Sequence, residues 1–250
     1  MIWLAFRQFR AALAGTAVLV LVLVTVLAVH GFSAHQLLAQ AETQGCVSTG
    51  LAPCDELIHQ LTRRLRQLAP YLGYLAFSAP LIGAFWGAPL VARELEGGTA
   101  ALAWSQSVTR RRWLTTQLTV GSTAVAVLGL VMGFSITAWM SVFADLYPGY
   151  SVYSFFTLHG ILLAVEWSSA FLIGAAAGAL ARRTLPAIAA TVLTVFAIGV
   201  ALSITSSGYT PTPNTTAAVF VGQLIESGLL LVAGGAAVVV AYQRVGKATA

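Results

Sequence analysis

Two carboxylates, Glu166 and Glu226, lie inside strongly apolar stretches of the 250-residue sequence. A carboxylate at the centre of a bilayer costs about 2.5–3.5 kcal/mol on insertion scales, so such residues usually face the interior of a helix bundle or a pathway. No Lys or Arg lies in either stretch to pair with them. His159 precedes Glu166 by seven positions, which is two helical turns, and Gln223 precedes Glu226 by three. These four residues are candidates for a polar pathway through the bundle.

Two interpretations of the acids stay open. In the first, Glu166 and Glu226 line a pathway and favour a cationic or amphipathic cargo. In the second, each is a protonated acid that is hydrogen-bonded to a backbone carbonyl or to Ser168, Ser169 or Ser227, and it holds helices together.

The other motifs that we sought are those of enzymes. A P-loop needs G-x-x-x-x-G-K-[ST], but the only lysine, Lys247, precedes Ala248, and Ala241 stands at the first glycine position. Neither H-E-x-x-H nor G-x-S-x-G occurs. Two cysteines and no cluster of metal-ligating residues leave no zinc or iron–sulfur site. We therefore expect this chain to be no enzyme, to bind no metal or cofactor, and not to hydrolyse ATP itself.

The composition defines the class of protein that must position these residues. The chain is 58% hydrophobic and 8% charged, whereas a soluble domain carries about 25% charged residues. So few charges do not cover a water-facing surface, which excludes a soluble enzyme and a disordered chain. The net charge of +5 is typical of the basic loops of a membrane protein, so we expect no nucleic-acid partner. The sequence predicts an all-α, polytopic membrane protein.

Six stretches are long enough to cross the bilayer, which takes about 20 mainly apolar residues. They are 11–31, 70–92, 114–140, 155–180, 185–206 and 217–242. With the N-terminus inside, ten cations lie on the cytoplasmic side and three, Arg63, Arg64 and Arg66, lie outside. Because cytoplasmic loops carry the excess of Lys and Arg, we expect both termini to be cytoplasmic.

The longest outer segment is the predicted loop 32–69, which contains both cysteines. In an oxidising compartment Cys46 and Cys54 are expected to pair, the alternative being two free thiols. Leucines at helical spacing follow, at positions 57, 61, 65 and 68, with acids before them and arginines among and after them. This order predicts an amphipathic helix that either caps the bundle or lies on lipid.

The predicted cytoplasmic loop 93–112 joins the second and third spans. Gly97 and Gly98 break the helix, and Thr99 is placed to cap a short apolar helix that ends near Trp104. Three arginines then open the next span. Apolar surface exposed between charged hinges marks a partner interface, although such a helix is also able to fold onto the inner surface of the membrane.

This loop resembles the coupling loop of ABC-2 type transporter permeases, the transmembrane subunits of bacterial ABC exporters. The matching pattern is a charged cluster with Glu-x-Glu-x-Gly-Thr, an apolar turn, and Val-Ser/Thr-Arg-Arg. The candidate coupling residues are Arg93, Glu94, Glu96, Gly97, Gly98, Thr99, Val108, Thr109, Arg110 and Arg111. The six-span layout fits the same family.

The resemblance implies a type V exporter-like permease fold in the cytoplasmic membrane of a bacterium. It also implies an ABC ATP-binding subunit that carries ATP and Mg²⁺ and docks on the loop, and a second permease copy or paralogue. The implied cargo is hydrophobic or amphipathic: a drug, an antibiotic, a peptide or a lipid. The last outer loop, Ser207 to Thr216, departs from the family because it is too short for the helical hairpin that several members have there.

Two other classes of function stay open. One is an ion-coupled secondary carrier that uses Glu166 and Glu226 as proton sites, and the other is a non-transporting membrane sensor or immunity component. Secondary carriers tend to show internal repeats, and we find no convincing repeat in this sequence. The carrier hypothesis also does not explain the segment Gly97–Arg112.

Overall fold

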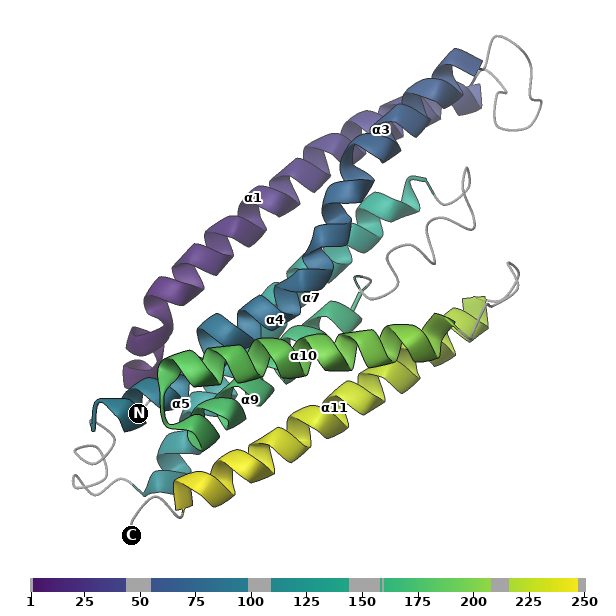
Figure 1. Cartoon of the computed structure of the whole chain (residues 1–250). Coiled ribbons are helices and arrows are strands. Elements are labelled where there is room, and N and C mark those ends of the chain that lie inside the picture. The colour runs from purple at the N-terminus through teal and green to yellow at the C-terminus, as the bar shows by residue number, and fades with distance from the viewer. Residues whose placement is uncertain are drawn as a thin grey trace.

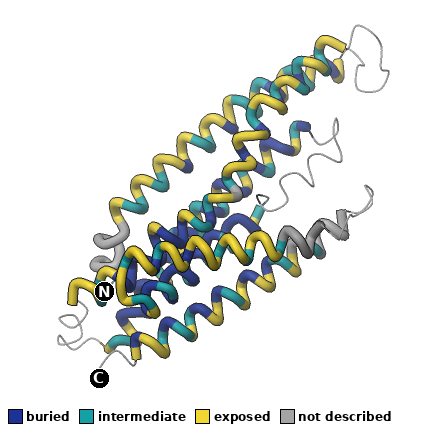
Figure 2. The backbone as a smooth tube through the Cα atoms, viewed as in Figure 1, coloured by how far each residue is buried: buried dark blue, intermediate teal, exposed yellow. Residues whose placement is uncertain are grey.

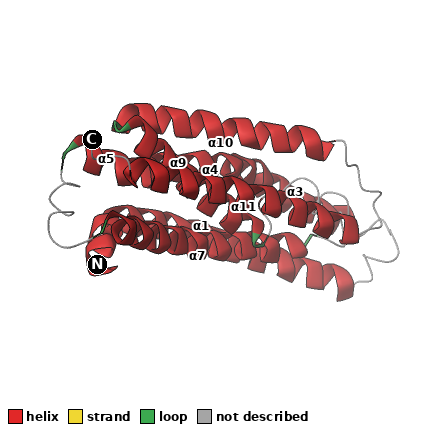
Figure 3. Ribbon diagram, turned by 90° about the horizontal axis from the view of Figure 1, so that it is seen from below, coloured by secondary structure: helices red, strands yellow, loops and turns green. Residues whose placement is uncertain are grey.

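A computed structural model describes residues 2–43, 55–98, 109–143, 158, 160–207 and 216–246. The regular elements of these residues are all helical (Figures 1 and 3). They are α1 (Ile2–Thr43), α3 (Asp55–Gly73), the 3₁₀ turn η2 (Tyr74–Phe77), α4 (Ser78–Ile82), the π-helical turn η3 (Gly83–Gly87), α5 (Ala88–Glu96), α7 (Arg110–Ser141), α9 (Leu162–Ala181), α10 (Thr184–Ser207) and α11 (Thr216–Gly246).

Within the described residues, six helical segments are long and apolar enough to cross a membrane. The segment Asp55–Glu96 is one of them, because α3, η2, α4, η3 and α5 follow one another without a break. The all-α fold with six membrane-spanning helices that composition and hydropathy predict is thereby confirmed. Both termini lie at the same end of the bundle (Figure 1), as an even number of crossings requires.

Helix α9 lies at the centre of the bundle. The most apolar stretch of α9 is 72% buried, against 11% for the corresponding stretches of α1 and α10. The helix packs against α7, α11, α5, η3, α10 and α4. Figure 2 shows the contrast between the buried centre and the largely exposed α10. Exposed apolar side chains on α10, such as Leu185 and Leu193, are what a lipid-facing helix requires.

Small residues allow α9 to approach its neighbours closely. A Cβ atom added at Gly174 would lie 2.2 Å from the carbonyl oxygen of Gly83, and one at Gly178 would lie 2.5 Å from that of Ala88. In return, a Cβ at Gly87 would lie 2.2 Å from the carbonyl oxygen of Phe171. The backbones of α9 and of the η3–α5 stretch are therefore in direct contact, which is how helices associate where lipid removes the hydrophobic driving force.

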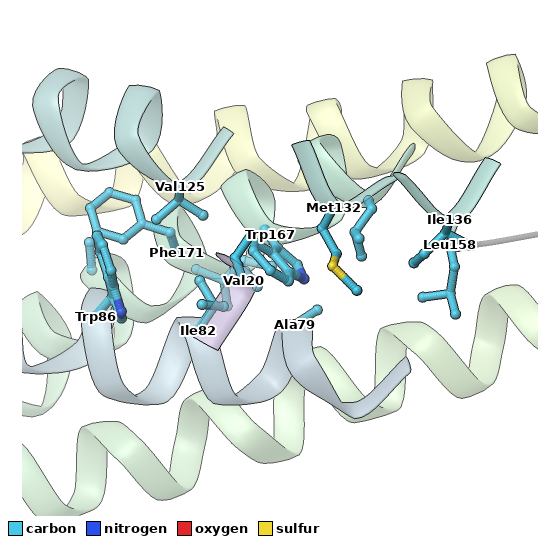
Figure 4. Packing of buried hydrophobic residues seen from close by; sticks show 14 of the residues in the cluster. Val20, Ala79, Ile82, Trp86, Val125, Met132, Ile136, Leu158, Trp167 and Phe171 are labelled. Carbon is cyan, nitrogen blue, oxygen red and sulfur yellow. The ribbon is translucent and has the colours of Figure 1, made fainter. Parts of the chain in front are cut away.

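Aromatic side chains fill the space around this contact. Trp167 and Phe171 of α9 lie in the main apolar cluster (Figure 4), with side chains of α7, α4 and η3 around them. The indole Nε1 of Trp167 donates a hydrogen bond to Ser78 Oγ at 2.8 Å, and that of Trp86 donates to Thr16 Oγ1 at 3.2 Å. Both polar edges are thus satisfied inside an apolar core.

The predicted outer loop 32–69 is helical wherever the structure describes it. Helix α1 continues to Thr43, and α3 begins at Asp55. The predicted leucine stripe is real, because Leu61 and Leu65 of α3 are buried, and α3 contacts α1. This packing along α1 disfavours a helix lying on lipid, but α3 does not lie across the end of the bundle either, because it prolongs the second membrane helix alongside α1 (Figure 1).

The fourth membrane helix begins later than the predicted residue 155, at Leu162. Gly160, which has a φ of +54°, directly precedes the turn into α9. Its N–H lies 3.0 Å from Thr137 Oγ1 and 3.3 Å from the carbonyl oxygen of Gly133. A left-handed glycine docked on α7 therefore sets the start of α9, and hydropathy alone does not detect such a turn.

Candidate functional site

Most of the described arginines gather at the end of the bundle that holds both termini (Figure 1). We call it the basic end, and it comprises Arg93, Arg110, Arg111, Arg112, Arg182, Arg183 and Arg244. Arg63, Arg64 and Arg66 lie on α3, toward the opposite end. The candidate coupling residues that the structure describes all lie at the basic end.

On the α5 side of the predicted coupling loop, the helix ends at Glu96. The N–H of Gly97 donates to the carbonyl oxygen of Arg93 at 2.9 Å, and Gly98 has a φ of +67°. A left-handed residue after a helix is the usual glycine stop. Arg93 is exposed and Glu94 half-buried. The predicted Gly97–Gly98 break is present at the residues where the sequence places it.

The carboxylate of Glu96 reaches the first residue of α10. Its Oε2 accepts a hydrogen bond from the backbone N–H of Thr184 at 2.9 Å and another from Thr184 Oγ1 at 2.7 Å. The helix α5 is thereby linked to α10 across 88 positions of sequence. Sequence reasoning missed Thr184 because no local pattern indicates a contact at that separation.

On the α7 side of the loop, Thr109 is the N-cap of α7, and its Oγ1 accepts from the N–H of Arg112 at 3.4 Å. Arg110 Nη1 donates to the carbonyl oxygen of Gly246 at 3.5 Å, and the hydroxyls of Thr115 and Tyr242 share a hydrogen bond. The start of α7 is therefore attached to the end of α11, while Arg111 is exposed.

Several predicted site residues lie outside the described part of the chain. They are Thr99 and Val108 of the coupling loop, the pathway candidate His159, and the disulfide candidates Cys46 and Cys54. Gln223 belongs to α11, but its side chain is not described.

The two intramembrane acids meet at the interface of α9 and α11. Both helices end at the basic end and so run parallel, and Ser169 Oγ donates to the carbonyl oxygen of Leu230 at 2.9 Å. Glu166 lies three residues before Ser169 and Glu226 four before Leu230, which is about 4.5 and about 6 Å along the helix axes. The two half-buried carboxyl groups therefore lie at nearly the same level of this interface.

The serines near these acids bear on the second interpretation of the acids. Ser168 Oγ donates to the carbonyl oxygen of Ala164 at 2.6 Å, and Ser169 Oγ donates to that of Leu230. Each serine hydroxyl thus already donates its hydrogen to a backbone carbonyl. Toward a protonated acid these serines are therefore able to act only as hydrogen-bond acceptors. The two acidic side chains lie at one level of the α9–α11 interface, at the two candidate pathway positions predicted from the sequence.

The six long apolar helices of the described residues define a multi-pass membrane protein. A family model described as ABC-2 membrane transporter related matches residues 17–206, about three quarters of the chain, and the chain belongs to this family. The resemblance to ABC-2 type permeases is thus confirmed at the level of the family. The matched range includes the predicted coupling loop and Glu166, whereas α11 with Glu226 follows it. No curated protein and no solved structure matches the chain.

Proposed function

We propose that the chain is the membrane-spanning permease subunit of an ATP-driven exporter. ATP and Mg²⁺ are bound by a separate subunit that docks on the loop between α5 and α7, and a second permease copy or paralogue completes the outward path. Family membership supports the transport role. The observation that carries the coupling role is that both ends of this loop are hydrogen-bonded to membrane helices, through Glu96 to α10 and through Arg110 to α11.

The proposed orientation places the basic end in the cytoplasm of a bacterial cell. Cytoplasmic loops carry the excess of Lys and Arg, and the basic end holds both flanks of the coupling loop. A docking site on this side is accessible to a subunit that uses cytoplasmic ATP. The cargo proposed is hydrophobic or amphipathic, because the candidate pathway acids Glu166 and Glu226 lie on otherwise strongly apolar helices.

The docking site is tested by charge reversal at the loop flanks. The variants Glu94→Lys and Arg111→Glu are each expected to reduce the amount of ATP-binding subunit that co-purifies with the tagged chain by at least about tenfold, since misplaced charges at an interface cost several kcal/mol. The measurement is quantitative mass spectrometry of the purified complex from its native membrane.

The matched control is Glu56→Lys, the same change at an exposed acid of α3 at the opposite end of the bundle. This variant should retain the subunit in full. A wild-type chain that purifies without any P-loop ATPase would contradict the proposed function itself, whereas full retention by both flank variants would contradict only the docking site.

A second candidate function is an ion-coupled carrier, and one observation favours it. Glu166 and Glu226 lie at the same level of the α9–α11 interface, and paired acids in a membrane are typical of proton relays. Transport by reconstituted vesicles that follows an imposed proton gradient and needs no ATP would support the carrier and contradict the exporter.

A further inference from the structure

The first turn of α10 lacks a capping side chain of its own. Helix α9 ends at Ala181, and its C-cap Arg182 has a φ of 53°. The carbonyl oxygen of Arg183 accepts the first hydrogen bond of α10, from the N–H of Ala187 at 3.2 Å. Arg183 is thus the N-cap residue, and arginine has no acceptor atom in its side chain. Pro186 has no N–H, so the first-turn amides that need an acceptor are those of Thr184 and Leu185.

Glu96 provides the acceptor from another helix. Its Oε2 accepts from both the N–H and the hydroxyl of Thr184, so it satisfies an amide of the first turn, as an N-cap side chain does for the amide of N2 or N3. A carboxylate is favoured at this position because the N-terminus of a helix carries partial positive charge. The last residue of α5 thus supplies the acceptor for the first amide of α10.

The contact between α5 and α9 provides the rigid support for this cap. Gly178 of α9 lies against the backbone of Ala88 and Ala92, and Ala88 and Ala92 are buried in a cluster with Ala187 of α10. These small residues leave no side chain that is able to absorb a displacement of α5 by changing its rotamer.

We propose that Glu96 is a positioning residue that makes α10 follow α5 when the coupling loop moves. The inference rests on the proposed function and changes the role of one candidate coupling residue. Glu96 does not bind the ATP-binding subunit but transmits the movement of the loop to α10. On the other flank, Arg110 and Thr115 attach α7 to the last turns of α11, so the loop acts on both of the last two membrane helices.

The cap itself is tested by hydrogen exchange of the purified full-length chain in nanodiscs, which requires no partner. Glu96→Ala is expected to speed the exchange of the amides in the first two turns of α10 by at least about fivefold, the lower end of usual coupling energies. Glu96→Gln keeps an acceptor oxygen and should exchange nearly as slowly as the wild type. Glu56→Ala on α3 is the matched control, and unchanged exchange in Glu96→Ala overturns the proposal.

The transmission is tested in the complex with the ATP-binding subunit. Spin labels at Val29→Cys on α1 and Leu193→Cys on α10, both exposed sites, report the distance between the two helices with and without Mg-ATP, after Cys46 and Cys54 are replaced by serine. We expect Glu96→Ala to reduce the ATP-dependent change in distance by at least about fivefold while ATP hydrolysis persists. Glu96→Gln keeps the acceptor oxygen and should therefore show the wild-type change in distance. If Glu96→Ala acted only by disturbing the fold, the glutamine variant would not be expected to recover this change.

Each other outcome has a defined meaning. A change in distance in Glu96→Ala equal to that of the wild type overturns the proposal, and so does a wild-type complex in which α10 does not respond to ATP. Loss of the ATP-binding subunit from Glu96→Ala would assign Glu96 to the docking surface instead. If the wild-type chain carries no such subunit, the proposed function fails, while the exchange experiment still decides whether Glu96 caps α10.

Discussion

Replacing Gly174 by alanine is expected to lower the melting temperature of the purified chain by at least about 5 °C, since overpacking a tight contact costs about 1–3 kcal/mol or more. A Cβ atom at this position would lie 2.2 Å from the carbonyl oxygen of Gly83 and 2.8 Å from the backbone nitrogen of Ala88. Both are backbone atoms, so no rotamer change relieves the clash, and α9 must separate from η3 and α5. Thermal unfolding followed by tryptophan fluorescence in detergent measures the effect.

Gly235 of α11 provides the matched control. It is exposed, and a Cβ atom added there meets nothing within 4 Å. Gly235→Ala should leave the melting temperature unchanged or raise it slightly, because alanine is the better helix former. Equal melting temperatures for Gly174→Ala and the wild type would show that α9 and the η3–α5 stretch are not in backbone contact.

The second large effect is expected on cargo selectivity. Replacing both Glu166 and Glu226 by glutamine should reduce ATP-driven uptake of the lipophilic cation tetraphenylphosphonium into inside-out vesicles by at least about tenfold, which corresponds to about 1.4 kcal/mol. An ionised carboxylate about 4 Å from a cation attracts it by about 4 kcal/mol at an effective dielectric constant of about 20, which exceeds this amount. Each single variant keeps one carboxylate and should lose less.

The controls separate a pathway role from a structural one. Glu42→Gln changes an exposed acid near the end of α1 and should transport the cation normally, and a neutral probe such as Nile red should be transported equally by all variants. If the double variant transports the cation at the wild-type rate but melts at a lower temperature, the acids hold α9 and α11 together instead, which is the second interpretation of the sequence.

The spanning helices were predictable because each needs a long apolar run, and such a run is a local property of the sequence. The same holds for the break at Gly97 and Gly98 and for the leucine face of α3. By contrast, the limits of helices that end in close contacts were not predictable. Gly160 starts α9 late because it docks on Gly133 and Thr137, and such a contact exists only in the folded chain.

The candidate site was predictable residue by residue but not as an arrangement. The sequence places Glu166 and Glu226 at similar depth, but the register that brings them together is set by Ser169, Leu230 and the close approach at Gly234. The contact between Glu96 and Thr184 carried no signal, because the Glu-x-Glu-x-Gly-Thr pattern indicates docking on a partner and not a cap within the chain.

The π-helical turn η3 has a consequence for the direction in which the coupling loop leaves the bundle. The five residues of η3 are wound in a wider coil and turn through a smaller angle about the helix axis than five residues of an α-helix. The side chains after Gly87 are therefore rotated back by roughly a quarter of a turn. Since α5 follows η3 without interruption, this smaller rotation sets the direction in which Glu96 leaves the helix. If η3 alone were wound as an α-helix, the carboxylate of Glu96 would point away from Thr184, and the link between α5 and α10 at the basic end would be lost.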